Sequence, residues 1–429
     1  MKKILAILVA AIMLLSMTSA IAEFNNVPND ISGEITIYVY YADSGIPLVD
    51  FALAKLAEKY PDLKINIEHR ADSDGTAIKT WAAVGELPDL FQVTNADTYE
   101  TLRDNGDFYI VDDAVAATGF YDMFNAGDVW AEANRDADGN SYAAGVNNSD
   151  VFLCFYNIAL FEELGLSEPT NFEEFKHCIT VLKDAGKLPI ALFAAEQWPG
   201  MAIYELACVA EGVYEGVDGV GEGTTTFAGD ERFMKAAEKL QEIVDMGAFG
   251  TGTLSTNASQ AFELCKTGEA GFVFNGSWHF DTAETENYGD NMGWCRYNVF
   301  ADADKAEEVK DHAVGGMPTN LNFFVNANPN SGVEPETLAQ LGLEFLYYME
   351  LARAEGGLRS LVKGEFEFNG SEHFAAFCDY ITTYKTFNNM PFNIANGELA
   401  ATFGNAVEMM ISGNFTAQDF IDEMTACGF

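Results

Sequence analysis

The sequence predicts an α/β protein built as two lobes. Its 429 residues exceed what one hydrophobic core usually organises, since single cores stop growing at about 250–300 residues. Between residues 34 and 93, segments with strand and helix spacing alternate, which is typical of a parallel sheet with helical crossovers. A second alternating series begins at residue 151. We therefore expect each lobe to have its own core.

The first part of the chain supplies three strands and two helices. β-Branched and aromatic residues, or alternation of apolar and polar residues, predict strands at 34–41, 64–70 and 90–93. Apolar residues that recur every three or four positions predict helices at 47–60 and 76–84. Strands and helices in this order indicate parallel strands joined by right-handed crossovers.

From residue 151 the alternation resumes. Short apolar runs predict strands at 151–156, 189–193, 270–274 and 322–325. Amphipathic spacing predicts helices at 172–182, 202–213, 231–246, 336–348, 373–387, 400–411 and 416–425. Thr170 with Glu173 predicts a capping box for the first of these helices, and Asp230 and Thr416 are predicted caps of two others.

Two motifs are similar to ion or nucleotide loops. Residues 134–139, NRDADG, match the first half of a calcium loop, but Gly145 stands where a bidentate glutamate is needed. A hairpin turn at Asp138-Gly139 is the favoured interpretation. The GVGEG of residues 219–223 follows a helix and lacks the GxGxxG spacing, which argues against a nucleotide loop.

The charge balance limits the classes of partner. The chain has 23 basic and 66 acidic residues, for a net charge of −43. A surface this negative repels phosphate backbones and anionic lipid headgroups, which argues against nucleic acid and membrane-surface partners. A protein with this net charge attracts a neutral or cationic ligand more readily than an anionic one. The five histidines are scattered and form no metal-ligand set, so we expect no metal and no cofactor.

Residues 1–22 have the features of a signal peptide. Two lysines precede an apolar stretch at 4–15, and Ala20-Ile21-Ala22 offers a cleavage site with small residues. The apolar stretch is too short to span a bilayer, so we expect an exported protein. The seven cysteines are widely spaced without a CxxC pair, and we interpret them as buried small hydrophobic residues.

Residues 259–278, SQAFELCKTGEAGFVFNGSW, combine a short helix, a buried strand and a polar loop. Gly268 suits the C-cap of the helix, and the apolar run 270–274 suits the strand. Asn275-Gly276-Ser277-Trp278 then brings an amide, a hydroxyl and a large ring to the place where the strand emerges. Ligands of open α/β sheets bind beyond the carboxyl ends of strands, so this tetrapeptide is a candidate recognition loop. The alternative is a turn whose tryptophan packs on the core.

Polar and aromatic side chains recur at the ends of other apolar runs. Carboxylates and amides suit sugar hydroxyls, and aromatic rings suit the apolar face of a sugar. The candidate ligand-binding residues are Tyr41, Asp43, Trp81, Asn95, Asp97, Asn147, Trp198, Asn275 and Trp278. Each of them, taken alone, also fits a core or turn residue. No GxSxG, HExxH or Walker motif occurs, and no catalytic residue is assigned.

In this order, the segments resemble the extracellular solute-binding proteins of ABC sugar importers, the family that includes maltose-binding protein. The resemblance covers nearly all of the predicted mature chain. The segments that carry it are GEITIYVYY, FALAKLAEKYPDLKINIEHR, WAAVGELPDLFQV, DGNSYAAGVNNSDVFLCFYNIALFEELGL, NFEEFKHCITVLKDAG, GEAGFVFNGSW and TFGNAVEMMISGNFTAQDFIDEM. Each segment alone resembles the family only loosely, whereas the order of the segments along the chain is specific to the family.

The resemblance implies a type II periplasmic-binding-protein-like fold, in which a ligand is closed between two lobes joined by a three-crossing hinge. The crossings are expected near 147–151, 313–317 and 390–393. Lobe one is then expected at 33–147 and 318–390, and lobe two at 148–316 and 391–429. The implied protein is a monomer without enzymatic activity that binds a mono- or oligosaccharide outside the cytoplasm and delivers it to the transmembrane subunits of an ABC permease.

Two alternatives stay open at this point. The chain also fits an exported carbohydrate-active enzyme, or a receptor of the same fold for a ligand that is not a sugar. One departure from many relatives is the absence of a lipobox cysteine, because the first cysteine is Cys154. We therefore expect an extracytoplasmic protein without a lipid anchor.

Overall fold

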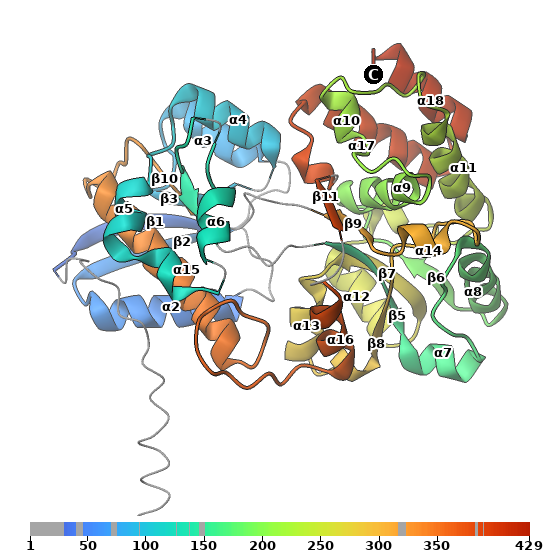
Figure 1. Cartoon of the computed structure of the whole chain (residues 1–429), viewed down its shortest axis with the longest axis horizontal. Coiled ribbons are helices and arrows are strands. Elements are labelled where there is room, and N and C mark those ends of the chain that lie inside the picture. Colours follow the sequence, from blue (N-terminus) through green and yellow to red (C-terminus); the bar gives the residue numbers. More distant parts are fainter. Residues whose placement is uncertain are drawn as a thin grey trace, which may run out of the picture.

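The structure is a computed structural model that describes residues 30–39, 46–69, 75–93, 95–125, 127–136, 138–145, 151–315, 323–381, 385–388 and 390–429. It has two bodies side by side, each built around its own sheet (Figure 1). We call the body around the first sheet lobe one and the body around the other lobe two. The predicted signal peptide at 1–22 lies outside the described residues.

The sheet of lobe one has the strand order β2-β1-β3-β10-β4. Its strands are β1 (Gly33–Val39), β2 (Leu63–His69), β3 (Leu90–Gln92), β4 (Ala143–Ala144) and β10 (Phe323–Val325). β1 runs parallel to both β2 and β3, which confirms the prediction from the alternating segments. β10 pairs antiparallel with β3 and β4, so the chain returns from lobe two to complete this sheet.

Helices cover both faces of the first sheet. They are α2 (Ile46–Lys59), α3 (Thr76–Val84), α4 (Ala96–Asn105), α5 (Asp112–Thr118), η2 (Phe120–Met123), α6 (Gly127–Ala133) and α15 (Pro335–Glu355). Side chains alternate along a strand, so Ile37 of β1 packs with α2 and α15 whereas the neighbouring Tyr38 packs with α3 and α4. Lobe one therefore has a core on each face of its sheet.

The sheet of lobe two has the strand order β6-β7-β5-β8. Its strands are β5 (Phe152–Asn157), β6 (Leu188–Ala191), β7 (Ala270–Gly276) and β8 (Met292–Cys295). β6 and β7 are parallel, whereas β5 is antiparallel to both β7 and β8. Every residue of β7 is buried, which explains its small and apolar sequence.

Lobe two is rich in helices. They are α7 (Ile158–Leu164), α8 (Phe172–Asp184), α9 (Trp198–Ala210), α10 (Asp218–Gly221), α11 (Glu231–Asp245), η3 (Thr253–Ser255), α12 (Ala258–Lys266), α13 (His279–Thr285), η4 (Gly289–Asn291), α14 (Ala306–Val309), α16 (Glu372–Tyr380), η5 (Pro391–Asn393), α17 (Gly397–Ile411) and α18 (Ala417–Ala426). α9 is buried along its whole length because it packs against both α11 and α17. Within the described ranges, no helix has the length and apolar composition of a membrane span.

The segment after α15 differs from the predicted division into lobes. Residues 318–390 are predicted from the sequence to belong to lobe one, but Phe374 and Phe377 of α16 stack on Phe280 of lobe two, with ring centroids 4.7 and 4.8 Å apart. β11 (Lys385–Asn388) also pairs with β9 (His312–Gly315), which contacts β5 and α9. The chain therefore crosses between the lobes within 356–371 and not near 390–393. The other two predicted crossings fall partly outside the described residues.

Two helix boundaries also differ from the predictions. The helix predicted at 373–387 ends at Tyr380, and the chain continues into β11. α9 begins at Trp198 and not at residue 202, with Pro199 in its first turn, where the missing N–H of proline costs no helical hydrogen bond. Among the helices of seven or more residues, α4, α5, α6, α7 and α13 were not predicted from the sequence.

The helix caps are partly as predicted. Asn171, and not Thr170, caps α8, because the Asn171 Oδ1 accepts a hydrogen bond from the Glu174 N–H at 3.0 Å. The predicted caps at Asp230 and Thr416 are confirmed. Both side chains accept a hydrogen bond from an N–H in the first turn of their helix, which satisfies one of the free donors there.

The hairpin predicted at Asp138-Gly139 is wrong, since α6 precedes this turn and the two-residue β4 follows it. The turn is held instead by the Asp136 Oδ1, which accepts hydrogen bonds from the N–H groups of Asp138 and Asn140 at 2.9 and 2.8 Å. Among the residues that the structure describes, no group of three or more acidic, histidine or cysteine side chains is placed to hold a metal ion.

The seven cysteines are all free thiols. Five of them are buried, as predicted for small hydrophobic residues, whereas Cys378 is half-buried and Cys427 is exposed. Burial raises the pKa of the Cys265 thiol to about 12, which makes this thiol a poor nucleophile near neutral pH.

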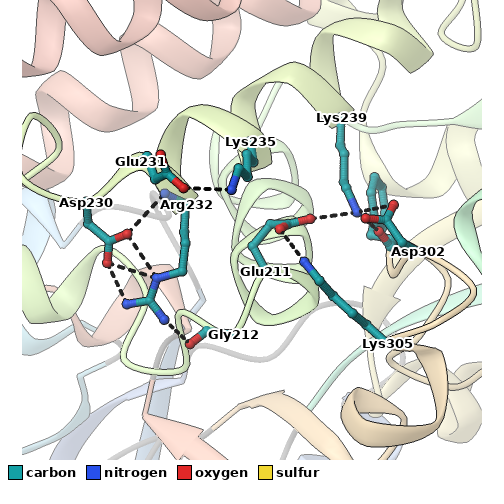
Figure 2. A network of polar contacts seen from close by, with 10 residues as sticks. Glu211, Gly212, Asp230, Glu231, Arg232, Lys235, Lys239, Asp302 and Lys305 are labelled. Carbon is teal, nitrogen blue, oxygen red and sulfur yellow. Dashed lines mark hydrogen bonds and ion pairs between the residues drawn. The ribbon is translucent and has the colours of Figure 1, made fainter.

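A network of ion pairs joins the end of α9 to α11 and to the segment before α14 (Figure 2). The Lys239 ammonium lies 2.8 Å from a Glu211 oxygen and 3.0 Å from an Asp302 oxygen, and Lys305 contacts the second Glu211 oxygen at 2.8 Å. Lys239 also donates a hydrogen bond to the Phe300 carbonyl at 2.8 Å. The Glu211 side chain is only 2% exposed, so these cations compensate a carboxylate that water hardly reaches.

Glu205 is a buried carboxyl group of α9 that provides a pH-dependent test of this packing. Its Oε1 accepts a hydrogen bond from the Val217 N–H at 3.0 Å, and burial raises the pKa of the carboxyl well above its ordinary value of 4.5. The folded protein therefore keeps a proton that the unfolded chain releases. The contribution of this proton to the free energy of unfolding is complete below pH 4.5, the ordinary pKa of the carboxyl. It is lost as the pH rises through the pKa that Glu205 has in the folded protein.

We expect Glu205→Gln to remove this loss, because an amide cannot ionise. In the window above the unfolded pKa, the free energy of unfolding of the native protein should fall relative to the variant by up to about 1.4 kcal/mol per pH unit. Urea unfolding of both proteins at pH 5 and pH 8 measures the difference. Equal differences at the two pH values would contradict a neutral, buried Glu205.

Candidate ligand-binding site

The candidate recognition loop begins inside a strand and not beyond its end. β7 continues through Asn275 and Gly276, and Asn275 lies opposite Leu153 of β5 with only 2% of its surface exposed. The Ser277 N–H then donates to the Val151 carbonyl at 2.8 Å, and its Oγ accepts from the Val151 N–H at 3.3 Å. The first part of the tetrapeptide therefore holds the sheet together.

Trp278 emerges at the carboxyl end of β7 and leads directly into α13. Its ring lies across the backbone of Gly276, so closely that a Cβ on Gly276 would come within 2.1 Å of the indole carbons. Only glycine leaves room for the ring at that place. The missing side chain of Gly276 thus fixes where the half-buried Trp278 lies.

Gly276→Ala is therefore expected to displace the Trp278 ring, because a methyl group and the indole would occupy the same space. Overpacking of this kind costs about 1–3 kcal/mol of folding free energy. The tryptophan fluorescence of the folded variant should change as well. Gly271→Ala is a matched control on the same strand, since its methyl group would meet the Leu182 side chain and no tryptophan. An unchanged fluorescence in Gly276→Ala would contradict the expected displacement.

Three aromatic side chains from separate segments meet beside this loop. The Trp198 ring centroid lies 5.7 Å from that of Trp278 and 5.1 Å from that of Phe392 in η5. Trp198 is 9% exposed, whereas Trp278 and Phe392 are half-buried. We call these three residues the aromatic cluster. Phe193 and Phe152 pack against Trp198 from the core, at centroid distances of 5.4 and 5.7 Å.

Polar side chains adjoin Trp198 of the aromatic cluster. The Trp198 Nε1 donates to a Glu196 carboxylate oxygen at 3.1 Å, and the Gln197 side chain donates to the Asn405 Oδ1 at 3.1 Å. Gly404 lets α17 approach Gln197, since a Cβ there would lie 2.6 Å from the Gln197 Oε1. Carboxylate and amide groups next to aromatic faces suit a ligand with hydroxyl groups and an apolar face.

The predicted site residues of lobe one have structural partners. The half-buried Trp81 packs edge-to-face on Tyr38 at 5.4 Å, within the core between the sheet and α3. The Asn95 side chain caps α4 by accepting a hydrogen bond from the Thr98 N–H at 2.8 Å. Both residues were predicted because an aromatic or amide group stands near the end of an apolar run. Core contacts and helix caps use the same residue types, so the pattern does not distinguish these roles from ligand binding.

Asp97 differs from these two because it faces lobe two. Its carboxylate pairs with Lys79 at 2.7 Å, and a Cβ on Gly397 would lie 2.9 Å from the Asp97 Oδ1. Gly397 is the first residue of α17, and α4 also contacts η5, which carries Phe392. The structure thus brings Asp97 of lobe one to the segment of lobe two that carries Phe392 of the aromatic cluster.

Tyr41, Asp43 and Asn147 lie outside the described residues. Of the other predicted site residues, the structure brings Trp198 and Trp278 into direct contact. Phe392 was not predicted as a site residue, although it is an aromatic residue that directly follows a proline. Its position beside Trp198 depends on a contact between residues almost two hundred positions apart, which local patterns do not reveal.

A surface groove elsewhere on lobe two holds about 590 Å³ and contains none of the predicted site residues. It lies where the loop after α11 meets the end of α17, opposite the α17 terminus that faces Asp97. Its lining residues are Val244, Asp245, Phe249, Gly250, Thr251, Gly252, Thr253, Leu254, Ser255, Ile411, Ser412 and Gly413.

The family model of the bacterial extracellular solute-binding proteins matches residues 42–319, more than half of the chain. This protein belongs to that family. The match includes β7, Trp198 and Trp278, and it ends before α15 and the C-terminal helices. It also confirms the resemblance seen in the order of the sequence segments.

One curated relative of this solute-binding protein is an uncharacterized ABC transporter extracellular-binding protein of Pyrococcus horikoshii, which is 24% identical over 280 residues. The alignment covers 61% of this chain and spans only 58% of that relative's length.

Two solved structures share the fold over nearly the whole chain. One, from work on xylan utilization by Caldanaerobius polysaccharolyticus, is 19% identical and covers 92% of this chain and 100% of its own, with a TM-score of 0.76. The other is a chitin oligosaccharide binding protein, 18% identical, which covers 92% of this chain and 98% of its own, also with a TM-score of 0.76. These similarities confirm the predicted two-lobed fold.

Proposed function

We propose that this solute-binding protein captures a mono- or oligosaccharide outside the cytoplasm and delivers it to the transmembrane subunits of an ABC permease. The observation that carries the proposal is the aromatic cluster of Trp198, Trp278 and Phe392 at the carboxyl end of β7. The names of the two similar structures, which refer to chitin oligosaccharides and to xylan, support a carbohydrate ligand.

The cluster suits a sugar for physical reasons. A pyranose ring exposes C–H groups on one face, and burying that face on an indole or phenyl ring removes apolar surface from water. The hydroxyl groups at its edge both donate and accept hydrogen bonds, which matches the Glu196 carboxylate and the Gln197 and Asn405 amides. An anionic ligand would meet a protein of net charge −43, which disfavours it.

In this proposal the ligand lies between the lobes. Lobe one comprises the described residues within 30–145 and 323–371, and lobe two comprises those within 151–315 and 372–429. Lobe two supplies the aromatic cluster, and lobe one supplies Asp97. The predicted residues Tyr41, Asp43 and Asn147 complete the proposed site. Closure of the lobes by a hinge motion then encloses the sugar and presents a surface to the permease.

The protein is proposed to act as a monomeric receptor without catalytic activity. Chemistry on the ligand is not needed, because release follows when the lobes open at the permease. An exported carbohydrate-active enzyme is the alternative class. Turnover of a glycan that one carboxylate substitution abolishes would establish that alternative.

A ligand panel tests the proposal directly. The mature protein is titrated by calorimetry and thermal shift with monosaccharides, with xylo- and chito-oligosaccharides and other glycans, and with peptides and polyamines. Binding of a sugar raises the unfolding temperature, since the ligand binds only the folded state. Binding of a peptide or polyamine, with no sugar giving heat or a thermal shift, would overturn the sugar assignment.

A further inference from the structure

α13 connects the aromatic cluster to the boundary between the lobes. Trp278 immediately precedes this short helix with α-helical backbone angles, so its backbone moves together with the helix. On one side Phe280 of α13 stacks on Phe374 and Phe377 of α16, the helix that follows the 356–371 crossing. Whatever sets the position of α13 therefore also sets the position of Trp278.

An ion pair holds the other side of α13 to lobe one. Asp281, in the first turn of α13, pairs with Arg353 in the last turn of α15. Both side chains are only 14% exposed, and Arg353 also lies 3.5 Å from Glu350 on its own helix. A partly buried ion pair is screened less by water and salt than a surface pair, so this contact can couple two bodies.

The two ends of the ion pair belong to different lobes. α15 packs on α2 and on the sheet of lobe one, and the chain leaves it through the 356–371 crossing. Asp281 lies three residues after Trp278, on a helix packed in the core of lobe two. A rotation of one lobe against the other therefore pulls on α13 through this contact.

We propose that Arg353 is a positioning residue for the binding site, which holds α13 and thereby Trp278 in place through Asp281 and so couples the angle between the lobes to the aromatic cluster. The functional meaning of this coupling rests on the proposed sugar-binding function. The mechanical coupling itself can be measured without any ligand, so a failure of the coupling can be told apart from a failure of the proposed sugar-binding function.

The test compares three variants of the mature protein with the native protein. Arg353→Met removes the charge and keeps much of the apolar stem. The variant Arg353→Asp with Asp281→Arg exchanges the two charges, and Glu350→Gln is included in it so that the new carboxylate does not face Glu350. Lys266→Met is the matched control, because Lys266 pairs with Glu286 at the other end of α13 at 2.9 Å and both residues belong to lobe two.

Hydrogen exchange of the α13 amides in the ligand-free proteins is the deciding measurement, with the radius of gyration from small-angle scattering as a second. We expect Arg353→Met to speed exchange in α13 about tenfold and to change the radius of gyration, and the charge exchange to restore both. Lys266→Met should leave the radius of gyration unchanged. If Arg353→Met affects neither quantity more than Lys266→Met does, the coupling is overturned.

A consequence for binding follows for any panel sugar that gives heat. Affinity for that sugar should be about tenfold weaker in Arg353→Met and near native in the charge-exchanged protein. If affinity is weak in both variants although hydrogen exchange is normal in the charge-exchanged protein, the ion pair couples the lobes mechanically but its proposed role in binding is overturned.

Discussion

Trp278→Ala is expected to abolish or greatly weaken sugar binding while the protein stays folded. The indole is half-buried against Trp198 and over Gly276, so alanine removes an accessible aromatic face at the proposed site. Truncation of a central aromatic residue commonly costs about 2 kcal/mol or more of binding free energy. Calorimetric titration with the sugar that binds the native protein measures the loss, and urea unfolding measures the change in stability.

Trp294→Ala is the matched control for this experiment. Trp294 is also a half-buried tryptophan of lobe two, but its ring packs on Phe377 and Tyr380, away from the aromatic cluster. The Trp294→Ala variant should be less stable than the native protein and should bind the sugar with native affinity. Native affinity in Trp278→Ala would mean that this ring only packs on the core, which was the alternative interpretation of the sequence.

The alternation of strands and helices predicted most of lobe one because its first strands are local and sequential. β1, α2 and β2 follow one another with clear periodicity, and β1 pairs with both β2 and β3 as expected. α4 was missed because its sequence, ADTYETLRDN, is polar on most sides and buries only Thr98 and Leu102. A helix held mainly by caps and ion pairs leaves little apolar pattern to detect.

The division into lobes failed where the deciding contacts are distant in sequence. α16 has the same apolar spacing whether it packs on lobe one or on lobe two, and only its contacts with Phe280 and Trp294 assign it. The site shows the same limit. Residue types and strand ends pointed to Trp198 and Trp278, but Asn95 serves as a helix cap, and Phe392 reaches the cluster through the fold of the C-terminal segment.

Lys239→Met is expected to destabilise the protein by about 3 kcal/mol, because it leaves the buried Glu211 carboxylate with fewer partners. Lys239 contacts both Glu211 and Asp302 and donates to the Phe300 carbonyl (Figure 2). Methionine fills a similar volume, so the loss reflects the missing charge and hydrogen bond more than a cavity. Among the described residues, Glu211, at 2% exposure, would keep Lys305 as its remaining ion-pair partner.

Lys235→Met on the same helix provides the control, since Lys235 pairs with Glu231 at 2.9 Å while both side chains are exposed (Figure 2). An exposed pair four residues apart contributes about 0.3–0.5 kcal/mol, so this variant should unfold almost as the native protein does. Combining Lys239→Met with Glu211→Gln should recover part of the loss, because the carboxylate that lost its partner is then neutral. If both lysine variants cost the same in urea unfolding, the buried network contributes no more than a surface pair.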